Sequence, residues 1–199
     1  MNGSAPEKQT RIFIDAGHGG SDPGAVNPRE HIKESDVALA IGKLLDDALR
    51  EIIPVLVIKH ARYDDRHISI EDRVAAAEEF KADIFISVHC NAAEDPQASG
   101  FEVWTSRGQT QADRLATAIH EALLGVMGGH YGRTDYDDGD PDKEANFYVL
   151  RHTSMPAVLV EGEFISNDDQ AVYLSLEENQ ADIAWAIAEA VSAYLGLGG

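Results

Sequence analysis

Short apolar runs alternate along this chain with longer segments whose apolar residues recur at helical spacing. Residues 11–15 (RIFID) have the pattern of a strand, and residues 34–52 (ESDVALAIGKLLDDALREI) have that of a helix. One face of this helix would carry the apolar residues Val37, Ile41, Leu44, Leu45, Ala48 and Ile52. A strand that leads into a helix and then into another strand is typical of a mostly parallel sheet. The alternation therefore predicts an α/β fold.

The same alternation continues along the sequence. Further strands are predicted at residues 54–59, 83–89, 100–106, 146–151 and 155–161. Further helices are predicted at residues 69–82, 111–127 and 176–197, with a loop rich in Gly and Asp at residues 128–145. The helix at 69–82 begins with Ser69 and has Asp72 at the capping-box position. Because no repeat or linker divides the sequence, we expect one domain at residues 11–197 after a flexible leader at residues 1–10.

Charge and cysteine content exclude several classes of protein. The 199 residues include 16 Lys and Arg against 35 Asp and Glu, which gives a formal net charge of −19 at pH 7. Such a chain repels nucleic acids at long range, so DNA and RNA are not expected partners. Its single cysteine, Cys90, excludes a scaffold held by internal disulfides. The sequence contains no apolar core of a signal peptide, and no stretch approaches the roughly 20 apolar residues of a membrane span.

Side chains with useful chemistry stand at the ends of three predicted strands. His18 follows the first strand, His89 ends the third, and Glu161 ends the last. Ligands of open α/β sheets bind at the carboxyl ends of strands, so these residues can meet at one edge. Glu34, at the start of the first helix, can join His18 because the intervening loop folds back. Simpler interpretations remain open, since strand-end histidines are often structural and Glu34 would complement the helix dipole.

Together the four residues have the composition of a hydrolytic metal site. Two imidazoles and one carboxylate, from His18, Glu34 and His89, form a ligand set that suits Zn²⁺ and leaves a fourth tetrahedral position for water. A further residue must then take a proton from that water and return it to a leaving amine. Glu161 is the candidate for this acid and base.

The glycine-rich segment around His18 allows two interpretations. Its backbone amides could cradle a phosphate, or the loop could present His18 to a metal ion. A phosphate-binding loop continues directly into a helix, whereas a long loop with Pro23 and Pro28 follows here. The context therefore favours the metal, with glycines that let the backbone turn and leave space above the ion. Asp15 and Asp22 flank the glycines and would orient His18 or shape its loop.

Four segments carry a family resemblance. They are DAGHGGSDPGA (residues 15–25), KESDVALAI (33–41), ADIFISVHCNA (82–92) and PAVLVEGEFISN (156–167). In this order they resemble the signature segments of the zinc-dependent N-acetylmuramoyl-L-alanine amidases, the amidase 3 family of cell-separation amidases and many phage endolysins. The segment ARYDDRHISIEDRVAAA (61–77) is similar to the arginine-containing segment of the family, so the resemblance covers nearly the whole chain.

This resemblance implies a fold, a cofactor and a substrate. The fold would be a single α/β domain with a mostly parallel six-stranded sheet flanked by helices. Zinc would be held by His18, Glu34 and His89, and Glu161 would be the catalytic acid/base. The substrate would be peptidoglycan, cut at the amide between N-acetylmuramic acid and the L-alanine of the stem peptide. Such an enzyme acts on the cell wall, in the periplasm, outside the cell or after delivery by a phage.

Several alternatives stay open beside this interpretation. Glu163 could face the metal in place of Glu161, although we prefer Glu161, which directly follows the strand, and Glu163 could then sit at the rim of the site. The domain could hydrolyse a different amide as a zinc peptidase or deacetylase, or it could bind peptidoglycan without cleaving it. Since a charge of −19 gives little attraction to an anionic wall, we expect a wall-binding module or activator outside this sequence, or adaptation to high ionic strength.

Other polar residues have weaker ties to function. We expect Arg73 to form a structural salt bridge, Cys90 to pack in the core, and Asn91 to support a ligand, contact substrate or cap a turn. Surface or structural roles are expected for the remaining histidines, His31, His60, His67, His120, His130 and His152. The loop at 128–145 is a candidate rim or lid of the site.

Overall fold

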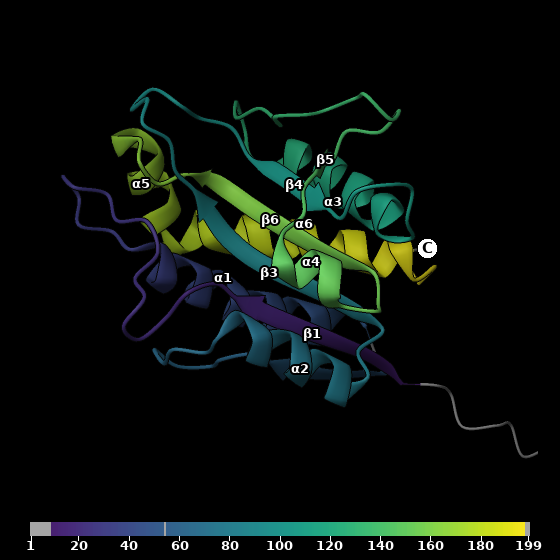
Figure 1. Ribbon diagram of the computed structural model, residues 1–199. Helices are drawn as coiled ribbons and strands as arrows, with labels where there is room; N and C mark the ends of the chain where they lie inside the picture. Colours follow the sequence, from purple (N-terminus) through teal and green to yellow (C-terminus); the bar gives the residue numbers. More distant parts are fainter. Residues whose placement is uncertain (1–8, 54, 198–199) are drawn as a thin grey trace, which may run out of the picture.

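The structure is a computed structural model that describes residues 9–53 and 55–197 of the chain (Figure 1). Its strands are β1 (Thr10–Ala16), β2 (Leu56–His60), β3 (Ile84–Asn91), β4 (Glu102–Thr105), β5 (Lys143–Glu144) and β6 (Ala157–Phe164). Its helices are α1 (Glu34–Ile52), α2 (Ile70–Phe80), α3 (Ala112–Val126), α4 (Tyr148–His152), α5 (Asp168–Ser175) and α6 (Glu177–Tyr194). Residues 1–8 of the expected leader and the first residue of the strand predicted at 54–59 lie outside the described residues. Thr10 belongs to β1 and pairs with Leu56, so the expected leader at residues 1–10 extends too far.

The strands form one sheet in the order β2-β1-β3-β6-β4-β5. Neighbouring strands are parallel, except that β4 and β6 are antiparallel. This arrangement confirms the expected α/β fold with a mostly parallel six-stranded sheet. In Figure 1 the arrowheads of β1, β3 and β6 all point toward the same edge of the sheet, so the carboxyl ends of these strands lie together.

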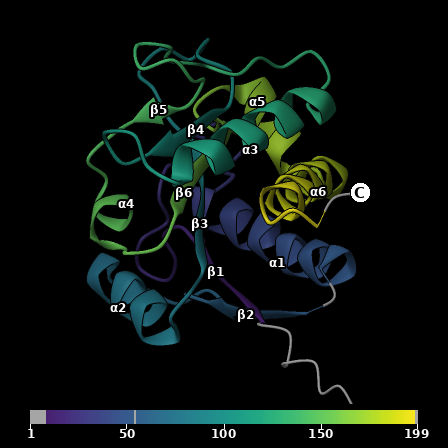
Figure 2. The same ribbon diagram turned by 90° about the vertical axis from the view of Figure 1, so that its right-hand side faces the viewer.

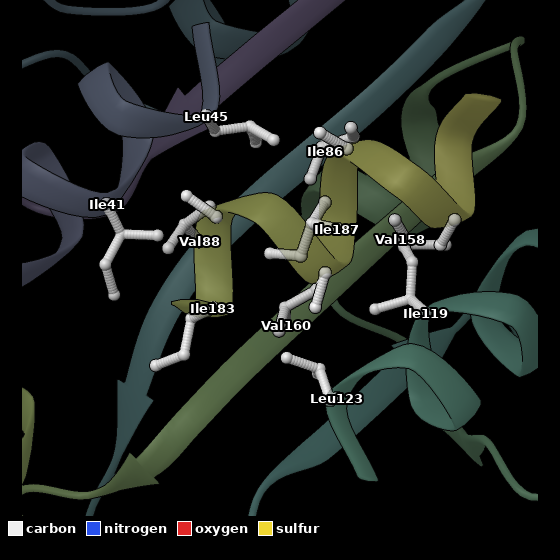
Figure 3. Close-up of a cluster of buried hydrophobic side chains, with 14 of the residues drawn as sticks. Ile41, Leu45, Ile86, Val88, Ile119, Leu123, Val158, Val160, Ile183 and Ile187 are labelled. Atoms are coloured by element: carbon white, nitrogen blue, oxygen red, sulfur yellow. The ribbon is translucent and has the colours of Figure 1, made fainter. Parts of the chain in front are cut away.

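Helices α1, α3 and α6 cover one face of the sheet, and α2 and α4 lie on the other (Figure 2). The larger core lies between the sheet and the first group of helices (Figure 3). It includes the aliphatic side chains of Ile41, Leu45, Ile86, Val88, Ile119, Leu123, Val158, Val160, Ile183 and Ile187. Full burial of a side chain of this size contributes about 1.5–3 kcal/mol relative to exposure. This core therefore holds in place β3 and β6, the strands that carry His89 and Glu161.

The opposite face of the sheet has a thinner cover. The rings of Phe13 and Phe85 stack there with centroids 5.6 Å apart, and Val74 of α2 and Leu150 of α4 complete the smaller core. The two covering helices are short, with 11 residues in α2 and 5 in α4. A cavity opens between their first residues, at the carboxyl ends of the central strands.

The bounds of α1 and the N-terminal cap of α2 agree with the sequence predictions. Helix α1 spans the predicted residues 34–52, and most residues of its predicted inner face are buried, with Leu44 and Ile52 half-buried. Ser69 caps α2 as predicted, because its side chain accepts a hydrogen bond from the backbone N–H of Asp72.

Other elements differ from the sequence predictions. The segment 146–151 is predicted as a strand, but its residues 148–151 belong to helix α4. Since β4 takes the place beside β6, this segment lies on the face of the sheet and buries the adjacent Val149 and Leu150. Helix α5 and the two-residue β5 are too short to show an apolar period in the sequence. Within residues 9–53 and 55–197, no helix has both the length and the apolar character that a membrane span requires.

Candidate metal centre

Three side chains that can bind metal converge at the carboxyl edge of the sheet. His18 lies just after β1, Glu34 is the first residue of α1, and His89 lies in β3. Glu34 Oε1 is 3.0 Å from His18 Nε2 and 2.8 Å from His89 Nδ1. One ligand atom from each residue lies within 4.8 Å of the other two, so the three residues can hold one metal ion.

Two glycines make room for this cluster. A Cβ at Gly17 would lie 2.2 Å from Cε1 of His89, so a larger residue would displace the imidazole. Gly24 has a φ of +65°, and a Cβ there would lie 2.5 Å from Oε2 of Glu34. The glycines of this loop therefore allow the backbone to approach the ligands closely as well as to turn.

Hydrogen bonds orient the side chains of the cluster. Nδ1 of His18 lies 2.8 Å from Oδ2 of Asp22, and its Nε2 faces Glu34. The backbone N–H of Ala25 donates to Oε2 of Glu34 at 2.9 Å, and that of Cys90 donates to Oε1 at 3.2 Å. Contacts of this kind fix the tautomer and the ring orientation of histidines that bind metal.

Two buried arginines hold the backbone of the His18 loop. Arg62 donates to the carbonyl oxygen of Gly17 at 2.6 Å, and Arg73 donates to that of His18 at 2.6 Å. Arg73 also forms the expected salt bridge, which joins it to Asp15 at 2.5 Å. Buried carbonyl groups need hydrogen-bond donors, so these guanidinium groups stabilise the loop that presents His18.

Glu161 of β6 lies beside His89 of β3, because the two residues pair in register in the sheet. Its Oε2 is buried and has no hydrogen-bond partner among the residues that the structure describes. Burial raises the pKa of Glu161 to about 7, although the nearby His89 opposes the rise. A carboxyl group with a pKa near neutrality can accept a proton and return it at that pH.

The imidazoles and the carboxylate of the cluster stabilise each other's charged forms. Burial alone would lower the pKa of His18, but Glu34 and Asp22 outweigh it and raise this pKa to about 9. Burial also opposes the charged form of His89, but the hydrogen bond to Glu34 keeps the pKa of His89 above its ordinary value. Despite burial, the two histidines hold the pKa of Glu34 well below its usual range. A divalent cation in place of the imidazole protons would supply the same positive charge.

A cavity of about 520 Å³ lies beside the cluster, between the first residues of α2 and α4. Ile70, Phe147 and Tyr148 line it and are 51%, 38% and 39% exposed, so apolar surface faces its opening. His67, for which a surface or structural role was the expectation, also lines this cavity. The strand-like pattern of residues 146–151 conceals the aromatic pair from sequence analysis.

The second glutamate of β6 lies away from the cluster. Glu163 is fully buried, with its Oε1 2.7 Å from Nδ1 of His130 and its Oε2 2.7 Å from the backbone N–H of Gly100. A place for Glu163 at the rim of the site is therefore excluded, because the segments before β4 and after α3 cover this residue. Cys90 is buried in the larger core, as expected.

A comparison with known protein families identifies the family of this chain. The sequence pattern of the N-acetylmuramoyl-L-alanine amidase family, Amidase_3, matches residues 12–193. The chain belongs to this family. The matched range of residues includes His18, Glu34 and His89 of the cluster, and it also includes Glu161.

Individual relatives agree with the amidase family. An endolysin of Bacillus phage SPP1 is 37% identical over 194 residues, which are 94% of this chain and 66% of the endolysin. The N-acetylmuramoyl-L-alanine amidase LytC of Bacillus subtilis (strain 168) is 34% identical over 187 residues, which are 92% of this chain and 35% of LytC. This chain thus spans less than two thirds of the length of these relatives.

A solved amidase structure shares the fold. The catalytic domain of CwlV, an N-acetylmuramoyl-L-alanine amidase from Bacillus (Paenibacillus) polymyxa var. colistinus, matches with a TM-score of 0.85 and 30% identity. The match covers 95% of this chain and 99% of that domain. The described fold is therefore that of an amidase catalytic domain.

Proposed function

We propose that this chain is a zinc-dependent N-acetylmuramoyl-L-alanine amidase with its catalytic domain at residues 11–197. It hydrolyses the amide between N-acetylmuramic acid and the L-alanine of the stem peptide in peptidoglycan. The observation that carries the proposal is the cluster of His18, Glu34 and His89 beside Glu161, in a chain that belongs to the amidase family.

The donor set supports zinc as the metal. Two imidazole nitrogens and one carboxylate leave one position of a tetrahedral site open, which is typical of catalytic zinc. His18, Glu34 and His89 would hold the ion, and Asp22 orients the ring of His18. Bound zinc supplies Lewis acidity for the carbonyl oxygen of the substrate and for the attacking water.

Glu161 is the acid and base of the proposed reaction. Its carboxylate accepts a proton from the attacking water, and it returns this proton to the nitrogen of L-alanine when the C–N bond breaks. The products are the carboxyl group of the muramoyl sugar and a stem peptide with a free amine. The buried Oε2 of Glu161, which has no partner among the described residues, supports this role, as does a pKa of about 7.

The cavity and the charge of the domain bear on how it meets its substrate. A volume of about 520 Å³ suits a sugar with part of an attached peptide, and the remaining glycan lies outside.

The net charge of −19 gives the domain no long-range attraction to an anionic cell wall. A wall-binding module or an activator outside this sequence therefore brings it to the wall, in the periplasm, outside the cell or after phage delivery.

The ends of the products test the proposed reaction. The protein is incubated with purified peptidoglycan, and the soluble products are analysed by mass spectrometry. We expect stem peptides with a free N-terminal L-alanine. New amino termini elsewhere in the stem would instead identify a peptidase, and binding without release of peptides would identify a binding domain.

Zinc affinity is expected to rise with pH. Metal-free His18 has a pKa of about 9 against an ordinary value of 6.5, so zinc must displace a proton at neutral pH. Each pH unit below that pKa weakens binding about tenfold, and His89, whose pKa is also raised, steepens the dependence. The dependence flattens above the pKa of His18. Titrations against a chelator of known affinity measure this slope, and a pH-independent affinity would contradict it.

Alanine at Gly17 is expected to weaken zinc binding. Because the new Cβ would lie 2.2 Å from the His89 ring, the ring or the loop must move. We expect a loss of about 1–3 kcal/mol in the free energy of unfolding and a fall of about tenfold or more in zinc affinity. Gly162→Ala is the matched control, since a Cβ there meets nothing closer than 3.4 Å. Denaturant unfolding and zinc titration of both variants check this, and equal affinities would contradict it.

A further inference from the structure

Glu102 of β4 is a buried carboxylate that pairs with Glu161 across the antiparallel β4–β6 ladder. Its Oε2 accepts hydrogen bonds from Nδ2 of Asn91 at 2.8 Å and from Nε1 of Trp104 at 3.1 Å. Both donors belong to strands of the sheet, so they hold the carboxylate in a defined position. The side chain of Asn91 thus contacts Glu102 rather than a residue of the metal cluster.

The other oxygen of Glu102 binds two cations. Oε1 lies 2.8 Å from Nε of Arg133 and 2.9 Å from Nζ of Lys143. One negative charge therefore holds two positive charges, in a chain whose net charge is −19. The side chains of Arg133 and Lys143 are 39% and 23% exposed, whereas that of Glu102 is 4% exposed. Solvent therefore meets the cations rather than the carboxylate.

Both cations keep hydrogen-bond donors for a ligand. An ammonium group has three N–H donors and a guanidinium group has five; Glu102 accepts one from each, and the side chain of Tyr131 is a further hydrogen-bond partner of Arg133. Lys143 lies over the ring of Trp104 at 4.5 Å. Arg133 lies over the ring of Phe164 at 5.0 Å. Two oriented cations with remaining donors suit a carboxylate ligand, because charge-assisted hydrogen bonds are the strongest in proteins.

These cations are held by Glu102, the residue that pairs with Glu161 on the neighbouring strand. Since β6 lies between β3 and β4, Glu161 has His89 on one side and Glu102 on the other. In the proposed reaction Glu161 protonates the leaving nitrogen, so the stem peptide extends from the Glu161 side of the scissile amide. Neighbouring strands are about 4.8 Å apart, and one extended residue spans about 3.5 Å. Glu102, which holds the cations, is therefore one strand spacing from Glu161, a distance that one to two residues of an extended peptide span.

We propose that Lys143 and Arg133 form a subsite for a free carboxylate on the second residue of the stem peptide. This inference rests on the proposed function and deepens it, because it names the charge that the site selects in its substrate. Glu102 is a positioning residue, which holds the two cations in place without contacting the substrate.

Two soluble muramoyl-peptides that differ only at the second stem residue test this subsite. One carries an α-carboxylate there, and the other carries the α-carboxamide. For the zinc-loaded protein we expect kcat/KM to be about 10- to 100-fold higher for the carboxylate, as a hydrogen bond to a charged group implies. In Lys143→Met and in Arg133→Met this ratio should fall sharply. Because both substrates meet the same preparation, partial unfolding of a variant lowers both rates and leaves the ratio unchanged.

Two further variants serve as controls for the carboxylate subsite. Arg114→Met removes one positive charge from α3, on the other face of the sheet, and should leave the ratio unchanged. Lys143→Arg keeps the charge and should keep most of the preference. Equal rates of the original protein on both substrates, or an equal loss on both in Lys143→Met, would overturn the subsite. Cleavage of neither substrate by the original protein would overturn the proposed function itself, and the subsite with it.

Discussion

Replacement of Glu161 by glutamine is expected to lower kcat/KM on peptidoglycan by about 10²- to 10⁴-fold. Glutamine has nearly the same shape as glutamate, but it cannot take a proton from water or return one to the leaving nitrogen. The three proposed ligands, His18, Glu34 and His89, are unchanged, so zinc affinity should stay close to that of the original protein. The rate of stem-peptide release and a zinc titration, measured on one preparation, check both parts of the expectation.

Glu163→Gln is the matched control for this variant. It makes the same change two residues further along β6, where the side chain contacts His130 and Gly100 rather than the cluster. We expect Glu163→Gln to lower thermal stability more than the activity of the folded protein, because it alters a fully buried pair. A larger loss of activity in Glu163→Gln than in Glu161→Gln would show that the roles of the two residues are reversed.

Replacement of His89 by alanine is expected to lower zinc affinity by more than about 100-fold. Removal of a residue that only supports a metal ligand lowers affinity by up to about 100-fold, and the loss of a ligand should exceed this. The change removes an imidazole and its 2.8 Å contact with Oε1 of Glu34, which keeps His18 and the backbone N–H of Cys90 as partners. Peptidoglycan hydrolysis should fall to background at zinc concentrations that saturate the original protein. Metal content after gel filtration and the rate of peptide release measure the two effects.

A surface histidine provides the control for the loss of His89. His31 is exposed and has a φ of +57°, a conformation that asparagine adopts readily, so His31→Asn should leave metal content and activity unchanged. Full zinc content in His89→Ala would contradict the assignment of His89 as a ligand. A similar loss in both variants would mean that the loss of zinc is not specific to His89.

The cluster can be predicted from the sequence because its residues stand at the ends of strongly patterned elements. The apolar periods of β1, α1 and β3 fix where these elements end, and parallel strands bring their carboxyl ends to one edge. These two facts make His18 and His89 candidates, whereas Glu34 also depends on a loop that folds back and the family resemblance selects the three as one ligand set. The position of Glu163 does not follow from the strand pattern, since it shares a strand with Glu161 and contacts from distant segments bury it.

The cavity wall and the cations near Glu102 are not predictable from local patterns. Helix α4 has five residues, too few for a helical period, and Phe147 precedes it. Arg133 and Lys143 lie in the loop region at residues 128–145, whose sequence has no regular period. Their positions depend on a carboxylate that is 31 and 41 residues away in the chain, and such long-range pairing leaves no local signal.

Chelation followed by restoration of zinc tests the central claim most directly. Release of stem peptides from purified peptidoglycan is followed by mass spectrometry in the original protein, after removal of metal, and after addition of zinc to the metal-free protein. The account predicts peptides with a free N-terminal L-alanine that cease to form without metal and form again with zinc. Undiminished release after complete removal of metal, or peptides with other amino termini, would contradict it.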